Sequence, residues 1–143
     1  MTSERNPAAE LSALGLAVKR VQSRDHRAMD AALRPLGVSL VQWDALRAID
    51  REPGASAHQL ALATFQSDQA WGTLATRLVD RGLVERSPGV GRRVVHELTD
   101  DGRALLAEGT AVTERMLPEL FTGISAQEQR LLLALLQKVL DAG

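Results

Sequence analysis

The sequence predicts a mainly α-helical protein with one small β-hairpin. Its 143 residues are 45% hydrophobic but only 3% aromatic, so the core must consist mainly of Leu, Ala and Val, a mixture that favours helix. Three capping signatures of the form S-x-x-Q or S-x-x-E mark helix starts after Ser39, Ser56 and Ser125. Residues 83–98 have the strand–turn–strand pattern of a hairpin. A chain of this length suits one domain with a real core.

The N-terminal part predicts a long helix at residues 9–33 and a shorter one at residues 40–50. Pro35 lies just beyond the first helix and prevents it from continuing. Ser39 and Gln42 then form the capping box that opens the second helix.

The middle of the chain predicts two short helices and a hairpin, in the order of a winged helix-turn-helix. The helices are expected at residues 56–63 and 67–81, with a three-residue turn between them. Strands are expected at 83–87 and 92–98, on either side of the turn sequence PGVG at 88–91. Two helices joined so closely can place the second, the recognition helix, in a DNA major groove. The hairpin, or wing, would offer arginines to the flanking backbone or minor groove.

The recognition helix has two distinct faces. Its apolar residues recur at i, i+3, i+4 and i+7 and predict a core stripe of Trp71, Leu74, Ala75 and Leu78. The opposite face carries short polar groups that suit base edges, with one glycine that permits close approach: Gln69, Gly72, Thr73, Thr76 and Arg77. An ordinary surface helix of a bundle would have the same stripe, but its outer face usually carries Lys and Glu. The wing that follows favours DNA binding.

Positive charge is local in this chain. The formal net charge is −1, so the protein lacks the overall basic character of many DNA-binding domains. Between residues 77 and 93, however, five arginines stand against two acidic residues. DNA binding requires a basic face, and this segment would supply one.

What the sequence lacks disfavours several classes of function. It has no cysteine, which excludes disulfides, thiolate metal sites and cysteine-based redox sensing. It shows no nucleophile or phosphate-binding motif, and His26, His58 and His96 lack metal-ligand spacing, so we expect neither an enzyme nor a cofactor or metal. It contains no secretion signal and no apolar run of membrane-spanning length, so we expect a cytoplasmic protein without membrane contact.

The C-terminal part predicts two further helices. Thr99 caps the first of them, and Pro118 should kink or break it at Leu117. Ser125 and Glu128 form the capping box of the last helix.

The last helix is apolar on more than one side, so several surfaces must cover it. One interpretation buries it inside the monomer. The other is a two-fold dimer of the first and last helices, with an interface made of Leu11, Leu14, Val18, Leu132, Leu135, Leu136 and Val139. Such a dimer would hold two recognition helices about one DNA turn apart, ~34–36 Å, and read a pseudo-palindrome.

Three segments together resemble the MarR (multiple antibiotic resistance regulator) family of transcription factors. LALATFQSDQAWGTLATRLVDRGLVER, at 60–86, is similar to the helix-turn-helix core of that family. LRPLGVSLVQWDALRAI, at 33–49, and HELTDDGRALL, at 96–106, are similar to the segments on either side. The order and spacing of these pieces carry the resemblance, which covers about residues 11–140.

The resemblance implies a homodimeric transcriptional repressor that binds a pseudo-palindromic operator in double-stranded DNA. It implies one domain over residues 1–143, with a DNA-binding lobe at 34–106 and dimerisation helices at 9–33 and 107–141. The residues expected to contact DNA are Ser67, Asp68, Gln69, Gly72, Thr73, Thr76, Arg77, Arg86, Arg92 and Arg93. The alternative is a winged-helix module used only for protein contacts, which would show no salt-dependent DNA affinity.

The resemblance also implies control by a small aromatic ligand, bound between the dimerisation helices and the DNA-binding lobe. Trp43, with Arg20, Arg24 and Arg47, would line such a pocket. Alternatively, Trp43 belongs to the core and the arginines are solvated.

Two features depart from the family pattern. Val90 replaces the aspartate of the D-x-R motif in the wing, so Arg92 lacks its usual partner, and the wing is about two residues shorter. Phe65 occupies a place in the helix–helix turn where many members have glycine, which would change the angle between the two helices.

Overall fold

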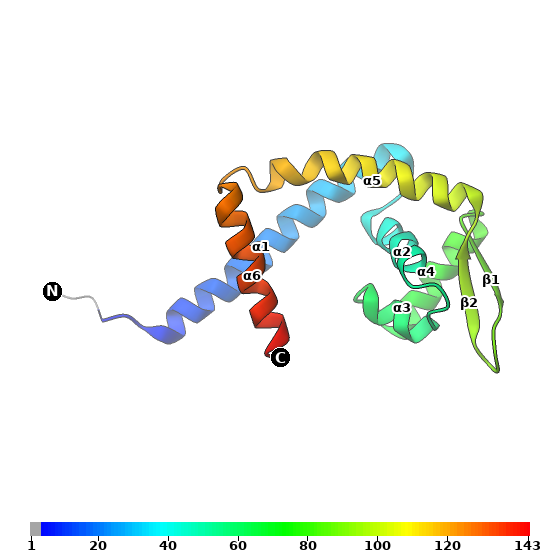
Figure 1. Ribbon diagram of the computed structural model, residues 1–143, viewed down its shortest axis with the longest axis horizontal. Helices are drawn as coiled ribbons and strands as arrows, with labels where there is room; N and C mark the ends of the chain where they lie inside the picture. The colour runs from blue at the N-terminus through cyan, green and yellow to red at the C-terminus, as the bar shows by residue number, and fades with distance from the viewer. Residues whose placement is uncertain (1–3) are drawn as a thin grey trace.

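The structure, a computed structural model that describes residues 4–143, is mainly α-helical with one two-stranded antiparallel sheet (Figure 1). The predicted fold class is therefore confirmed. In chain order the elements are α1 (Pro7–Leu33), the 3-10 helix η1 (Arg34–Leu36), α2 (Leu40–Arg51), α3 (Ala57–Ala63), α4 (Asp68–Asp80), β1 (Val84–Pro88), β2 (Val94–Leu98), α5 (Asp100–Leu120) and α6 (Ala126–Asp141).

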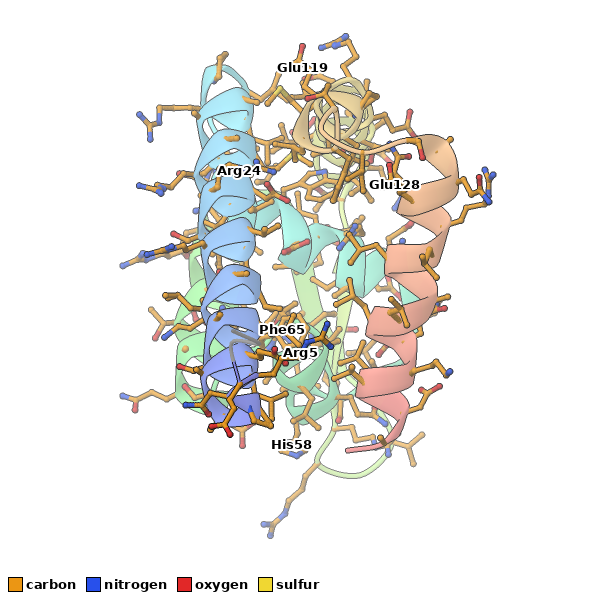
Figure 2. The ribbon with its side chains drawn as sticks, turned by 90° about the vertical axis from the view of Figure 1, so that its left-hand side faces the viewer. Arg5, Arg24, His58, Phe65, Glu119 and Glu128 are labelled. Carbon is orange, nitrogen blue, oxygen red and sulfur yellow. The ribbon has the colours of Figure 1, made fainter. Side chains whose placement is uncertain are left out.

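The elements separate into a lobe and an arm. Helices α2, α3 and α4 and the sheet form the lobe, while α1 and α5 extend together away from it (Figure 1). Helix α6 follows the far end of α5, and none of its residues is buried. Figure 2 shows α1 and α6 standing on opposite sides of the molecule. The interpretation that buries α6 inside the monomer is therefore wrong.

Local hydrogen bonds explain where the helices begin. Ser39, Ser56 and Ser125 each accept the N3 amide, and the N3 side chain returns a bond to the cap amide, so all three predicted capping boxes form. Ser67 and Thr99 cap α4 and α5 by the same side-chain contact. Each of these caps spans only three residues, which makes it readable from sequence.

The core lies inside the lobe. The predicted stripe of the recognition helix, Trp71, Leu74, Ala75 and Leu78, is buried throughout. It packs against α2, α3 and the first strand in one cluster of aliphatic residues around Leu46, Leu60 and Val84. A second cluster of Leu33, Val38 and Trp43 joins the end of α1 to α2 and α5. The lobe is thereby fixed to the arm.

The hairpin differs from its predicted bounds. The strands pair Val84 with Leu98 and Pro88 with Val94, so the loop comprises residues 89–93. Leu83 is not on the strand: it follows the left-handed Gly82 just after α4, and its amide closes the C-terminal cap of that helix by donating to the carbonyl of Leu78 at 3.0 Å. At the other end, the amide of Gly89 donates to the carbonyl of Arg93 at 2.7 Å and closes a wider loop than the predicted PGVG turn.

Of the kink or break expected at Leu117, the break does not occur. Helix α5 continues through Pro118 to Leu120. Pro118 lacks an amide hydrogen and so removes one backbone hydrogen bond, and only two residues of the helix follow it. Within residues 4–143, no helix combines the length and apolar character that crossing a bilayer requires.

Candidate functional site

The outer face of α4 is available to a partner. Gln69, Thr73, Thr76 and Arg77 are exposed and Gly72 is half-buried. The hydroxyl of Thr73 donates to the carbonyl of Gln69 at 3.2 Å, and that of Thr76 donates to the carbonyl of Gly72 at 2.9 Å. Because each hydroxyl proton is used within the helix, the threonine oxygens remain as acceptors. Acceptors suit the exocyclic amino groups of adenine and cytosine in the major groove.

The first turn of α4 carries two of the other predicted contact residues. Ser67 uses its hydroxyl to cap the helix, accepting the amide of Ala70 at 3.1 Å. Asp68 is exposed, and its carboxylate lies 2.8 Å from Nδ1 of His58 on α3. The pair connects the two helices of the helix-turn-helix. A carboxylate in this position also favours the positive end of the helix dipole.

Arg86 lies against the recognition helix. From β1 its guanidinium donates to the hydroxyl oxygen of Thr76 at 3.0 Å, which fixes the wing strand to α4. Thr76 therefore bonds within the protein through both its proton and one lone pair. Arg86 has further donors that remain for another acceptor. The sequence placed both residues at the DNA but did not predict their contact.

Directly behind this contact, His96 is buried in the core of the lobe. Its ring meets the ring of Trp71 edge to face, with centroids 5.7 Å apart. Burial lowers the pKa of His96 below its usual range, and the positive charge of Arg86 lowers this pKa further. His96 is therefore neutral at physiological pH and acts as a packing residue between wing and helix.

Arg92 and Arg93 lie in the loop at the tip of the wing. Both are exposed, and among residues 4–143 neither forms an ion pair. They were expected on a strand, but β2 begins only at Val94, so the loop extends through both of them. Together with Arg77 they place positive charge on the wing and on the recognition helix, as a phosphate-binding face requires.

A cavity of about 540 Å³ lies between the arm and the lobe. Trp43 and Arg47 of α2 line it, and the Arg47 guanidinium stacks 4.8 Å from the centre of the Trp43 ring. Asp44 pairs with Arg47 at 3.0 Å. The other lining residues include Asp25, His26 and Met29 of α1, Thr64, Phe65 and Gln66 of the turn, Thr113, Leu117 and Leu120 of α5, and Phe121, the C-cap of α5.

The structure does not bring the other two predicted pocket arginines into this cavity. Arg24 does not line the cavity itself: its guanidinium donates to the carbonyl of Leu120 at 2.7 Å and pairs with Asp25 at 3.0 Å, and both of these partners are lining residues. Arg20 is exposed on α1 and does not line the cavity. Sequence reasoning missed His26 and Phe65, because nothing in the local pattern places them beside Trp43. Within the described residues, no group of three His, Asp or Glu side chains is arranged to hold a metal ion.

The residues expected at a dimer interface are exposed and apolar. Leu11 is 68% exposed on α1 and Val139 is 70% exposed on α6. Leu132 and Leu136 line an apolar groove of about 620 Å³ between α6 and the end of α5. All the predicted interface residues are exposed: Leu11, Leu14, Val18, Leu132, Leu135, Leu136 and Val139. So much exposed apolar surface on two helices marks an interaction surface.

Comparison with known proteins agrees with this architecture. A sequence model of the MarR family matches residues 36–93. The HTH-type transcriptional repressor Rv2887 of Mycobacterium tuberculosis is 32% identical over 133 residues, which cover 92% of this chain and 96% of that protein. A crystal structure of Rv2887 with salicylic acid has a TM-score of 0.73 at 31% identity, covering 95% of this chain and 98% of that one.

A second solved structure combines the same fold with DNA. The crystal structure of a mutant MarR from E. coli complexed with operator DNA has a TM-score of 0.85 at 26% identity. The match covers 95% of this chain and 99% of that one. Because these relatives match along nearly their whole length, and because the lobe, the wing and the arm are all present, the chain belongs to the MarR family of winged helix-turn-helix transcriptional regulators.

Proposed function

We propose that this protein represses transcription as a homodimer bound to a pseudo-palindromic DNA operator. The observation that carries the proposal is the exposed face of α4, where side-chain acceptors lie beside an arginine-bearing wing. The E. coli MarR whose structure is similar was crystallised with operator DNA, which supports the same role here. Such a regulator works in the cytoplasm, where the DNA is.

The proposal divides the single domain at residues 1–143 by role. The lobe at 34–106 binds DNA, while the helices at 9–33 and 107–141 form the dimer. A partner copy would cover the apolar residues of α1 and α6 that the single chain leaves in water. A two-fold dimer presents two recognition helices, and half-sites about 10 base pairs apart would match them.

Within the lobe, the proposed roles follow from what each side chain can still bind. Gln69, Thr73 and Arg77 read base edges. Arg92 and Arg93 hold phosphates or the minor groove. Arg86 also holds a phosphate or the minor groove, through the guanidinium donors that do not bond to Thr76. The surface that approaches the groove is shaped by Ser67, Asp68, Gly72 and Thr76.

The first test is fluorescence anisotropy of the dimer on the DNA upstream of its own gene, with random DNA as the comparison, across a salt series. Tight, salt-sensitive and selective binding is expected. Weak binding without selectivity at every salt concentration would favour a winged helix used only for protein contacts.

Gln69→Ala should relax the sequence preference. Its amide is exposed on the reading face and can make paired hydrogen bonds to a base, worth about 1–3 kcal/mol of discrimination. The variant should therefore lose about tenfold or more in affinity for the operator while its affinity for random DNA stays the same. Competition anisotropy with both DNAs measures the ratio. Equal losses on the two DNAs would exclude base reading by Gln69.

Arg92→Ala should weaken binding to every sequence alike. The side chain is exposed at the tip of the wing, and the proposal places its charge at the DNA backbone or the minor groove. The plot of log affinity against log salt should flatten by about one unit. Arg5→Ala, an exposed arginine near the start of α1, is the matched control and should leave the slope unchanged. An unchanged slope in Arg92→Ala would place the wing tip away from the DNA.

We further infer that a small aromatic acid controls the repressor from the cavity between arm and lobe. The cavity is lined by the largely buried Trp43, offers a cation at Arg47 and has a volume that suits one small ligand. The structure of the similar repressor Rv2887 with salicylic acid supports this ligand class. Because the cavity lies between the dimerisation helices and the lobe, a ligand that prefers one dimer geometry would shift the spacing of the recognition helices.

A further inference from the structure

Phe65 has an unusual backbone conformation. It is the residue other than glycine with a positive φ, 58°, among residues 4–143. It follows Thr64, the C-cap of α3, and so occupies the position where a helix commonly ends in a left-handed glycine. A Cβ in this conformation is strained, so phenylalanine is a poor choice for the turn itself.

The surrounding turn imposes this conformation on Phe65. The hydroxyl of Thr64 is buried and donates to the carbonyl of Leu60 at 2.7 Å. The amide of Gln66 donates to the carbonyl of Ala61 at 2.9 Å, which closes the chain around Phe65. Both contacts belong to the neighbours, so they hold the backbone left-handed whatever side chain residue 65 carries.

The ring of Phe65 is also placed unfavourably for an isolated chain. Phe65 is 96% exposed, so an aromatic side chain stands almost wholly in water. Glycine at this position would remove both the strain and the exposed apolar surface. Strained residues that persist in a structure gather at ligand clamps and switch regions.

Phe65 lines the cavity that we assign to the effector. It contributes to the wall together with Thr64 and Gln66 of the turn, and with Trp43 and Arg47 of α2. Figure 2, which looks at the molecule from the side of α1 and α6, shows Phe65 between these two helices in projection. Because the Phe65 side chain is 96% exposed, its ring is available to an aromatic molecule bound at this cavity.

The position of Phe65 also connects the cavity to the DNA-binding surface. Ser67, which caps the recognition helix, follows Phe65 with only Gln66 between them. A ligand that holds the Phe65 ring acts on the start of α4 through two peptide units. The turn is thus the shortest covalent route from the cavity to the reading face.

We propose that Phe65 stacks on the ring of an aromatic acid in this cavity, while Arg47 meets the carboxylate, so that occupancy is transmitted to α4 through the turn. The proposal deepens the effector part of the proposed function and rests on it. Arg47 spends one contact on Asp44 and keeps further donors for an anion. Offset or edge-to-face pairing of two aromatic rings supplies the selectivity for an aromatic ligand.

The test is isothermal titration of the full-length protein with salicylate and with cyclohexanecarboxylate, which has the same charge but no aromatic ring. Phe65→Gly and Phe65→Ala should each bind salicylate about tenfold more weakly than the wild type. Phe65→Trp keeps an aromatic ring and should bind salicylate as the wild type does. Both losses should be confined to salicylate, so that the variants no longer distinguish the two acids. Leu62→Ala is the matched control, because Leu62 is an exposed apolar residue of α3 that does not line the cavity.

Operator affinity and oligomeric state, measured without ligand, separate the possible failures. The inference requires both to be unchanged in Phe65→Gly. Loss of operator affinity would assign Phe65 to the DNA surface, and loss of dimer would assign it to the subunit interface; either result overturns the inference. Wild-type affinity of Phe65→Gly for salicylate would overturn the role of Phe65 and leave the proposed function standing. Failure of the wild-type protein to bind salicylate would remove the effector proposal together with this inference, but would leave operator binding as a separate result.

Discussion

Leu135→Glu should convert the protein to a monomer and lower operator affinity at least a hundredfold. Leu135 lies on α6, where no residue is buried in the single chain and a row of leucines faces water. In the proposed dimer this side chain is covered by the partner copy, and two buried carboxylates across a two-fold axis would each lose their hydration. A monomer binds one half-site at a time, so it forgoes the gain of ~10²–10⁴ that linking two sites provides.

Sedimentation velocity measures the first effect and anisotropy on the operator measures the second. Gln137→Glu places the same charge on the same helix at an exposed polar position and should retain the dimer. The far-ultraviolet circular dichroism of Leu135→Glu should match that of the wild type, because the substituted side chain is already half-exposed in the chain alone. A Leu135→Glu protein that remains dimeric would exclude this face of α6 from the interface.

Gly102→Ala should lower the free energy of unfolding by about 3 kcal/mol, in the upper range for overpacking. A Cβ at this position would collide with the backbone carbonyl of Leu83, which cannot rotate away as a side chain can. The same junction holds the wing to α5: the Thr99 amide donates to the Leu83 carbonyl at 3.1 Å, and the Thr99 hydroxyl donates to the Gly82 carbonyl. The collision therefore strains the connection between the wing and the arm.

Urea denaturation at fixed protein concentration measures this effect. Gly15→Ala is the matched substitution, because Gly15 lies within α1 with open space around its Cα. That variant should be as stable as the wild type or more so, by up to ~1 kcal/mol, since alanine favours helix over glycine. If Gly102→Ala unfolds at the wild-type urea concentration, the close contact with Leu83 does not constrain the fold.

The helix starts and the buried face of the recognition helix could be predicted from sequence because both depend on nearby residues. A capping box closes within three residues, and the stripe from Trp71 to Leu78 repeats with the period of the helix. The ends of elements could not be predicted as well. Leu83 was expected to begin a strand, but its amide bonds into the C-terminal cap of α4. Pro118 was expected to kink or break α5, but the helix continues through it to Leu120.

The proposed DNA-binding surface could be predicted from the sequence only in part. The exposed polar face of α4 follows from periodicity, and the arginines of the wing follow from composition. The arrangement of these residues relative to one another does not follow from the sequence. Strand pairing places Arg86 opposite His96, and the ring of His96 packs against Trp71 of α4. Arg86 therefore lies on the same face of the hairpin, where it bonds to Thr76. A bond between two residues ten positions apart on different elements requires the hairpin register, which one sequence leaves open within a residue or two.

Capping signals, periodicity and composition were enough to establish a helical chain with a helix-turn-helix, an arginine-bearing wing and a last helix that is apolar on more than one side. The packing of the elements was needed to show that α6 is uncovered in the single chain, that Trp43 and Arg47 line a cavity without Arg20 and Arg24, and that Phe65 lines it too. The two groups of features differ in the distance along the chain over which they are set. Capping and periodicity act within one or two turns, whereas the cavity is formed by α1, α2, the α3–α4 turn and α5, which only the packing of arm against lobe brings together.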